Sequence, residues 1–317
     1  MRRVAHALPL FATDRAPPLA APPTGGGGAM SSAEFLAAVR GFDGLGTPTE
    51  AFEQEGIPYL VNAFWTAGQR QAHSLHEISY RACFKPQLPD FFIHRLTRPG
   101  EAVHDPFMGR GTTPLQAALA GRRPVGSDIN PLSVLLVRPR LDPPPLAAIA
   151  RRLAALPAAA SEKPPDELLA FFHPATLAAL GALRGLLLRH VRLSDPAPDP
   201  VLDWIRMVAI NRLTGHSPGF FSVYTMPPNQ AVSVEAQRKI NAARGQVPPP
   251  RDVAALILRK SRALLKDGPP PPHPPAGLHV ADSAATPAIA DASVDLVVTS
   301  PPFLDIVDYA EDNWLRR

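Results

Sequence analysis

The chain has a single cysteine, Cys83, among its 317 residues. One thiol excludes a disulfide framework and a zinc site built on cysteines. It is compatible with a reducing cytoplasm, where we expect the protein to be. No apolar run approaches the roughly 18–20 residues that cross a bilayer, so we expect no membrane-spanning segment. His73, His76 and His216 have no metal-ligand spacing, so no metal site is expected. The net charge of only +4 permits a nucleic-acid partner without requiring one.

Proline is abundant instead, with 40 residues that include the runs 248–250 and 269–272. Such runs favour extended backbone and cannot continue helices, so they predict spacers. Residues 1–29 end in a stretch of proline, alanine and glycine that cannot build a core, and we expect a disordered leader there. Met30 then opens a segment that begins like a helix with a capping serine. It is a candidate for the biological start.

The most specific motif is a short apolar strand that runs into a glycine loop and a helix. Its sequence is Asp105-Pro-Phe-Met-Gly-Arg-Gly-Thr-Thr113. Gly109 and Gly111 let the backbone take positive φ angles and approach a ligand closely, and Thr112 and Thr113 are able to cap the helix. The alternative is a bare tight turn. A phosphate-binding loop is excluded, because it needs Gly-Lys-Ser/Thr in sequence.

A second short strand, residues 124–128, ends in an acid. Asp128 follows the glycine loop by about 20 residues, which is the usual position for an acid that binds ribose hydroxyls in α/β folds. The alternative is an aspartate that caps the next helix. Asn130 follows Asp128 by two residues. In open α/β sheets, ligands gather at these carboxyl ends of the strands.

Two further strands end in polar residues. Residues 278–281 lead to Asp282, for which ordinary turn chemistry is the alternative. Residues 294–299 stop in the corner Ser300-Pro-Pro-Phe303. Pro301 and Pro302 have no backbone N–H and hold φ at about −65°, so the corner is rigid and its carbonyls point outward. The alternative is an apolar strand with a simple Pro-Pro stop.

Together, the glycine loop and the Ser-Pro-Pro-Phe corner resemble the amino-group DNA methyltransferases, which methylate cytosine or adenine with S-adenosylmethionine. The resemblance implies an α/β fold with a Rossmann-like sheet, of which strands 3-2-1-4 are present, and a mainly helical insert. It implies that Asp105 binds the ammonium group of the cofactor, and that Asp128 and Asn130 contact its ribose and adenine. Asp282 would face the adenine amino group. The other implied cofactor-binding residues are Phe84, Lys85, Phe107, Gly109, Gly111 and Thr112. For Phe84 and Lys85 the alternative is a helix that merely packs before the sheet.

The resemblance also implies the chemistry of the corner. Ser300 Oγ and the carbonyl of Pro301 would accept the two protons of the target amine and draw its nitrogen towards sp³ geometry. Pro302 would keep the corner rigid, and Phe303 would stack on a base flipped out of the duplex. The sulfonium leaving group drives the transfer, so positioning rather than a strong base supplies most of the catalysis. Serine at the first position of the corner favours cytosine N4, with adenine N6 or an RNA base as the alternatives.

Residues 136–276 are too long for a plain crossover and resemble a target-recognition insert. They separate the N-terminal helices and cofactor-binding half, residues 30–135, from the catalytic strand and corner, residues 277–317. The insert is predicted to be mostly helical, and the aromatic side chains of its loop either stack on DNA or pack in the core. Residues 232–267 carry eight basic side chains against three acidic ones, which predicts either phosphate contacts or a solvated face. The residues expected to bind double-stranded DNA are Arg238, Lys239, Arg259 and Lys260.

Four strands are fewer than the seven of this family, which are ordered 3-2-1-4-5-7-6. We therefore expect either a truncated gene product or a partner, a homodimer or a second polypeptide, that completes the sheet. The predicted activity is transfer of a methyl group from S-adenosylmethionine to cytosine N4 in DNA. Its setting would be a restriction–modification system, with a cognate restriction endonuclease as a further partner. The rival from another class is a catalytically inactive fragment that only binds cofactor or DNA.

Overall fold

The structure is a computed structural model that describes residues 29–43, 46–62, 72–80, 83–156, 165–190, 198–226, 232–302 and 314–316. Its contacts divide the chain into two compact units, residues 1–71 and 72–317. The leader up to residue 28 lies outside the described residues, and so does Phe303 of the corner.

The N-terminal unit contains one helix and one hairpin. Helix α1 (Ser32–Arg40) begins with a capping box in which Ser31 and Glu34 bind each other's backbone N–H groups, so the expected capping serine is Ser31. Strands β1 (Glu50–Gln54) and β2 (Ile57–Val61) pair in antiparallel fashion. The two residues of their turn, Glu55 and Gly56, have φ angles of 54° and 77°, as a tight two-residue hairpin requires.

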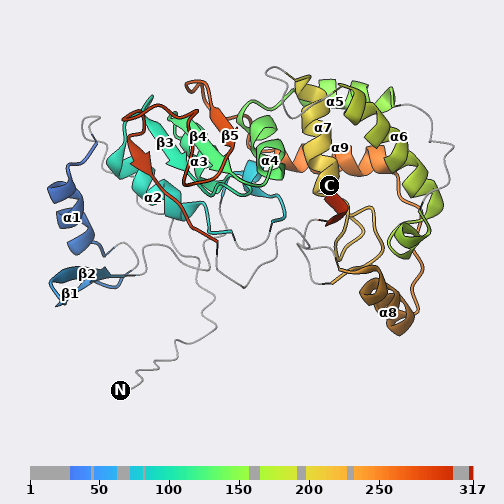
Figure 1. Cartoon of the computed structure of the whole chain (residues 1–317), viewed down its shortest axis with the longest axis horizontal. Coiled ribbons are helices and arrows are strands. Elements are labelled where there is room, and N and C mark those ends of the chain that lie inside the picture. Colours follow the sequence, from blue (N-terminus) through green and yellow to red (C-terminus); the bar gives the residue numbers. More distant parts are fainter. Residues whose placement is uncertain are drawn as a thin grey trace. The chain divides into compact units, whose positions relative to one another are not determined.

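The second unit is built on a four-stranded parallel sheet, which agrees with the predicted α/β class. Strands β3 (Ala102–Asp105), β4 (Arg123–Asp128), β5 (Gly277–Val280) and β6 (Leu296–Val297) lie in the order β5-β4-β3-β6. Helices α2 (Gln87–Leu96), α3 (Thr112–Leu119) and α4 (Leu132–Leu141) accompany the sheet (Figure 1). Because the strands are parallel, their carboxyl ends meet at one edge. That edge collects the residues that follow each strand.

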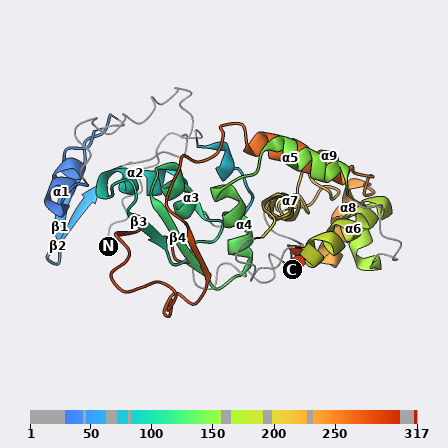
Figure 2. The same ribbon diagram turned by 90° about the horizontal axis from the view of Figure 1, so that it is seen from above.

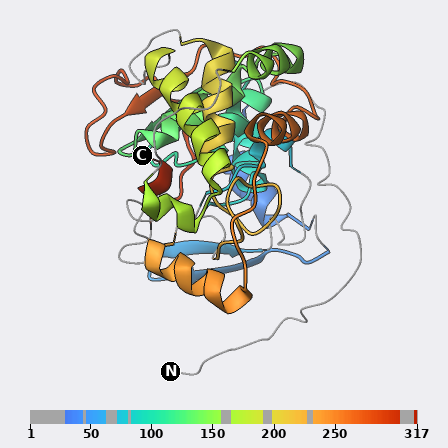
Figure 3. The same cartoon turned by 90° about the vertical axis from the view of Figure 1, so that its right-hand side faces the viewer.

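Every described element between α4 and β5 is helical. These elements are α5 (Leu146–Ala154), η2 (Asp166–Ala170), α6 (Pro174–His190), α7 (Pro200–Ile210), α8 (Val234–Arg244) and α9 (Val253–Leu264). The short helices η1 (Ser74–His76) and η3 (Trp314–Arg316) come from other parts of the sequence. Figures 1 and 2 show α4 between the sheet and α7, with α8 at the far end of this helical half. In Figure 3 the helical half lies in front of the sheet. No helix in the described ranges is both long and apolar enough to cross a membrane.

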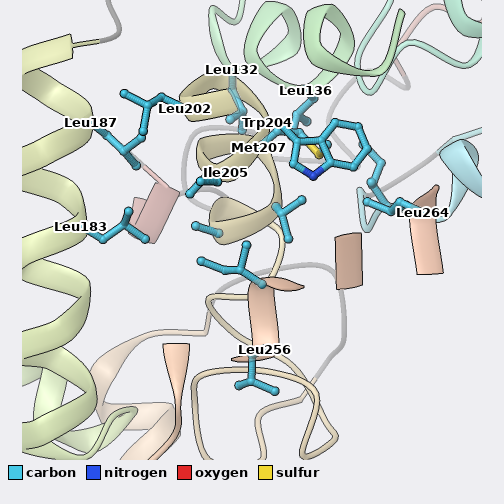
Figure 4. Packing of buried hydrophobic residues seen from close by; sticks show 14 of the residues in the cluster. Leu132, Leu136, Leu183, Leu187, Leu202, Trp204, Ile205, Met207, Leu256 and Leu264 are labelled. Carbon is cyan, nitrogen blue, oxygen red and sulfur yellow. The ribbon is translucent and has the colours of Figure 1, made fainter. Parts of the chain in front are cut away.

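One continuous core joins the sheet to the helical half. Leu115 of α3 and Leu136 of α4 belong to the same buried cluster as Trp204 of α7 and Ile257 of α9, and Figure 4 shows α4 and α7 side chains meeting around Trp204. The indole N–H of Trp204 donates to Ser261 Oγ at 2.9 Å, which satisfies the one polar atom of a fully buried ring. The helical half therefore packs against α3 and α4 through a shared buried cluster.

Candidate functional site

The glycine loop between β3 and α3 has the backbone that its sequence requires. Gly109 and Gly111 have φ angles of 49° and 76°, in the region that glycine tolerates best. A Cβ on Gly111 would overlap the side chain of Val137 in α4. The expectation that Thr112 and Thr113 cap α3 is wrong: the helix begins at Thr112 and has no side-chain cap. The Thr113 hydroxyl instead donates to the carbonyl of Val298, at 2.9 Å.

Asp128, at the end of β4, holds the glycine loop. Its Oδ2 accepts the N–H of Gly109 at 2.8 Å, and its Oδ1 accepts the N–H of Asn130 at 2.8 Å. Asn130 Oδ1 then accepts the N–H of Leu132 at 3.0 Å, at the start of α4. Asp128 does not cap α4, because Pro131 is at the capping position of this helix and no side chain makes a cap hydrogen bond there. Each carboxylate oxygen of Asp128 keeps a free lone pair, because a carboxylate accepts about four hydrogen bonds.

Asp105, at the end of β3, is fully buried. Its Oδ1 accepts the N–H of Phe107 at 3.0 Å and the hydroxyl of Thr299 at 2.7 Å. Its buried Oδ2 has no hydrogen-bond partner in the part of the chain that the structure describes. Burial raises the pKa of this carboxyl to about 6, although the Thr299 and Phe107 hydrogen bonds act in the opposite direction. A buried carboxylate oxygen without a partner is unfavourable. A cationic group of a ligand would satisfy it.

The strand before the corner is fixed at both ends. At its start, the Ala102 N–H donates to Asp295 Oδ2 at 2.7 Å. At its end, the Val298 N–H donates to the carbonyl of His104 at 3.1 Å. Ser300 is half-buried, and Pro301 and Pro302 are exposed. The corner therefore lies at the carboxyl edge of the sheet, at the end of a strand that is hydrogen-bonded to β3 and to Thr113 of α3.

A cavity of about 250 Å³ lies at this edge. It is lined by nine of the residues singled out in the sequence: Phe84, Phe107, Gly109, Thr112, Asp128, Asn130, Asp282, Ser300 and Pro302. Four others are not part of the lining, namely Lys85, Asp105, Gly111 and Pro301. A wider, more open depression of about 560 Å³ lies beside β5. Its lining is apolar apart from His279 and offers no acid or nucleophile.

Asp282 shows the turn chemistry that was the alternative for it. Strand β5 ends at Val280, and Asp282 is exposed with its Oδ1 accepting the N–H of Ala284 at 2.9 Å. Its side chain nevertheless belongs to the cavity wall. The described residues contain no group of histidine, cysteine and acidic side chains that could hold a metal ion.

The roles of two arginines, Arg110 in the glycine loop and Arg140 in α4, were not predicted from the sequence. Arg110 lines the cavity and donates through Nη1 to the carbonyls of His76, at 3.3 Å, and Ile78, at 3.0 Å. Arg140 is fully buried and donates to the carbonyls of Leu75, Leu136 and Arg110. Burial, and then the charge of Arg110, lowers the pKa of Arg140 to about 9. Together they tie η1 and the segment after it to the loop. For Arg140 the available signal was an arginine inside the otherwise apolar segment of α4.

Tyr80 and Cys83 also line the cavity without having been predicted. The thiol of Cys83 is partly buried, and this burial raises its pKa. Tyr80 lies against the glycine loop, since a Cβ on Gly109 would come 3.4 Å from Tyr80 Cε1. Tyr80 and Cys83 are about 25–30 residues from the glycine loop in sequence and reach it through tertiary contacts such as those of Arg110, so no local pattern marks them.

The four cations expected to bind DNA have different surroundings. Arg238 and Lys239 are exposed on α8, and Arg259 is exposed on α9. Lys260 is half-buried, with its Nζ 3.6 Å from Glu77 Oε2. Burial, and then the charge of Arg212, lowers the pKa of Lys260. None of the four lines the cavity.

Comparison with known proteins bears on the segment that builds this site. Residues 52–136 match the model of a family described as DNA methylase, whose name, N6_N4_Mtase, contains both amino-group positions. This segment is similar to DNA methyltransferases. It contains the glycine loop, Asp105, Asp128 and Asn130, and it ends before the insert and the corner.

Two curated relatives agree with the family match. The chain is 36% identical over 72 residues to the Type II methyltransferase M.MjaII of Methanocaldococcus jannaschii, which covers 23% of this chain and 13% of that protein. It is 31% identical over 94 residues to the Type II methyltransferase M.BsoBI of Geobacillus stearothermophilus, which covers 29% of this chain and 17% of that protein. The matches thus span less than a fifth of either relative. No solved structure matches the chain.

Proposed function

We propose that this chain transfers a methyl group from S-adenosylmethionine to the exocyclic N4 of cytosine in DNA. The observation that carries the proposal is the convergence on one cavity of the glycine loop, the acid at the end of β4 and the Ser-Pro-Pro corner. The similarity of residues 52–136 to DNA methylases supports the reaction class. The two relatives, both Type II methyltransferases, support a role in a restriction–modification system.

The residues around the cavity fit the cofactor chemically. Asp105 does not line the cavity, but its Oδ2, which has no hydrogen-bond partner among the described residues, suits an ammonium group. The free lone pairs of Asp128 suit ribose hydroxyls. Ile129 is 75% exposed in the cavity wall and offers an apolar surface to a purine ring. When bound, S-adenosylmethionine supplies an electrophilic methyl group on its sulfonium.

The corner residues would act on the target amine. Ser300 Oγ and the Pro301 carbonyl accept hydrogen bonds from its two N–H groups, so its nitrogen presents a lone pair to the methyl group. S-adenosylhomocysteine would be the leaving group, and one proton of the methylated nitrogen would be lost to solvent afterwards. Because Thr113 and Asp105 hold the strand before the corner, these acceptors are preorganised, and such positioning is the main source of rate in a transfer that needs no strong base. Phe303, which follows the corner in sequence, is proposed to stack on the flipped base.

Adenine N6 is the second candidate target, because the matched family carries both positions in its name. Serine as the first residue of the corner is what favours cytosine. Double-stranded DNA is the proposed partner. Strand β6 pairs only with β3 among the described strands, so its other edge is available to a strand from a homodimer or a second polypeptide.

The test is nucleoside mass spectrometry of unmethylated DNA after incubation with the purified, folded chain and S-adenosylmethionine. We expect N4-methylcytosine from the wild type, none from Ser300→Ala, and wild-type yield from Ser293→Ala, a serine of the same segment outside the cavity. Calorimetry checks that Ser300→Ala still binds the cofactor. N6-methyladenine would overturn the choice of base. A folded chain that binds cofactor and methylates nothing would overturn the proposed activity.

A further inference from the structure

Arg212, directly after α7, is held in one orientation. Its Cζ lies 4.1 Å from the centroid of the Phe220 ring, and its Nε donates to the carbonyl of Asn211 at 2.9 Å. Phe220 in turn packs so closely on Gly215 that a Cβ there would come within 2.5 Å of the ring. Within the described part of the chain, no hydrogen bond or ion pair uses the two terminal nitrogens of Arg212. They form a rigid fork of donors, which matches the oxygens of a phosphate.

Other cations gather around this fork. Burial, and then the charges of Arg316 and Arg259, lowers the pKa of Arg212 to about 10. Lys260, next to Arg259 on α9, is close enough for Arg212 to lower its pKa as well. Arg259 is exposed, and its Nη2 lies 3.4 Å from the carbonyl of Pro218 in the same loop. Like charges that the fold holds together repel each other, and a bound anion relieves that repulsion.

One acidic side chain is found at this cluster in the described ranges. Glu77 is paired with Lys260 at 3.6 Å, but the Glu77 side chain is 60% exposed and the pair is long. Such a pair contributes little. Among the described residues, no ion pair involves Arg212 or Arg259.

The cluster adjoins the cavity through residues 77–80. The N–H of Ser79 donates to Asn211 Oδ1 at 2.9 Å, beside Arg212. Glu77 contacts Lys260, and Tyr80, at the other end of this short segment, lines the cavity. The cations therefore lie next to the Tyr80 side of the cavity.

We infer that Arg212, Arg259 and Lys260 bind backbone phosphates of the DNA strand whose base enters the cavity. The inference rests on the proposed function and adds Arg212, a residue without any signal in the sequence, to it. It also separates the two groups of cations expected at the DNA. Arg259 and Lys260 belong to this phosphate site, whereas Arg238 and Lys239 lie on α8, at the far end of the helical half (Figure 1).

The test is the salt dependence of DNA binding, measured without cofactor by fluorescence anisotropy of a labelled duplex between 50 and 300 mM salt. The logarithm of the association constant falls linearly with the logarithm of the salt concentration. We expect Arg212→Gln and Arg259→Gln each to make this negative slope shallower by about 0.9, the contribution of one phosphate contact. The same contact accounts for about eightfold in affinity at 0.1 M salt. Arg184→Gln, an exposed arginine of α6, is the matched control for loss of one charge and should keep the wild-type slope.

Circular dichroism and the melting midpoint check that each variant is folded. Arg212→Lys keeps the charge and should keep the slope, so a defect of Arg212→Gln cannot be ascribed to misfolding alone. Unchanged slopes in folded Arg212→Gln and Arg259→Gln, or an equal loss in Arg184→Gln, would overturn the site. If the wild type methylates DNA and the two variants keep the wild-type slope, the proposed function stands and only the phosphate site is refuted. If the two variants have shallower slopes but the wild type never methylates DNA, the phosphate site stands and the proposed function is refuted.

Discussion

The hydroxyl of Thr299 donates to Asp105 Oδ1 at 2.7 Å, across 194 residues of sequence. Asp105 is the proposed ligand of the cofactor's ammonium group, and Thr299 directly precedes Ser300, the proposed acceptor for the target amine. One hydrogen bond therefore joins the cofactor side of the site to its catalytic side. It also offsets part of the free-energy cost of burying the Asp105 carboxyl completely.

Thr299→Val should weaken both the fold and the site. It keeps the shape of the side chain and removes the donor, which leaves a buried carboxyl oxygen with one hydrogen bond fewer. The expected loss in the free energy of unfolding is about 1–3 kcal/mol, measured by urea denaturation. The pKa of Asp105 should rise further, because this hydrogen bond acts to lower it. Thr299→Ser retains the hydroxyl and should stay within about 1 kcal/mol of the wild type; equal losses in both variants would contradict the role of the bond.

Asp105→Asn should change how stability depends on pH. Folding raises the pKa of this carboxyl from 3.8 to about 6, so between these values the folded state binds more protons than the unfolded one. The contribution of Asp105 to stability is therefore lost as the pH rises through this window, by at most about 3 kcal/mol. Asparagine does not titrate. The free energy of unfolding of Asp105→Asn relative to the wild type should accordingly increase from pH 4 to pH 6.5 and then level off, and a flat difference would refute the raised pKa.

Cofactor affinity should rise with pH over a similar range. An ammonium group binds the ionised form of Asp105, and a carboxyl with a pKa of about 6 is mostly protonated at pH 5. The affinity for S-adenosylmethionine, measured by calorimetry, should therefore increase up to about tenfold from pH 5 to pH 7. Asp105→Asn should bind weakly at every pH. An affinity that does not change with pH would exclude Asp105 as the ammonium ligand.

Gly111→Ala should be far more damaging than Gly121→Ala. Both glycines have positive φ, 76° and 71°, but a Cβ on Gly111 overlaps Val137. Apart from its two chain neighbours, no described residue lies within 4 Å of a Cβ on Gly121. Gly121→Ala should cost about 1–2 kcal/mol from backbone strain, and Gly111→Ala a further 1–3 kcal/mol from overpacking. Thermal unfolding measures both. Adding Val137→Ala should recover part of the Gly111→Ala loss, because it removes the overlapping methyl groups; no recovery would mean that the clash is elsewhere.

The two ion pairs that join α7 to neighbouring helices should differ in how much they contribute to the free energy of unfolding. Arg138 binds Asp203 through two hydrogen bonds of 2.7 and 2.9 Å, and the Asp203 side chain is only 2% exposed. Arg138→Met should cost about 3 kcal/mol, because it strips a buried carboxylate of its principal partner. Arg152→Met breaks the more exposed pair with Asp199 and should cost less than about 1 kcal/mol. Denaturant titration of both variants tests the contrast, and equal losses would refute it.

The sequence predicted those parts of the site that depend on local backbone. Strands that run into Asp105 and Asp128, and glycines where φ must be positive, follow from neighbouring residues, and parallel pairing then brings the strand ends to one edge. Contacts between residues far apart in the sequence could not be predicted in this way. Thr113 looked like a cap but bonds to Val298, 185 residues away. Arg140 finds its acceptors in backbone carbonyls, which leave no trace in residue type.

The insertion of the helical half between β5 and the first two sheet strands, β3 and β4, has a kinetic consequence. Strands β3 and β6 are neighbours in the sheet, yet the Asp105–Thr299 bond closes a loop of 194 residues. Pairing across such a separation is slow, since the loop entropy is lost before the contact forms. During synthesis at about 5–20 residues per second, the glycine loop would wait roughly 10–40 seconds for its partner strand. The nascent chain therefore carries an unpaired β3 edge for that time, and the site is completed only when β6, the last of the four described sheet strands in sequence, has been made.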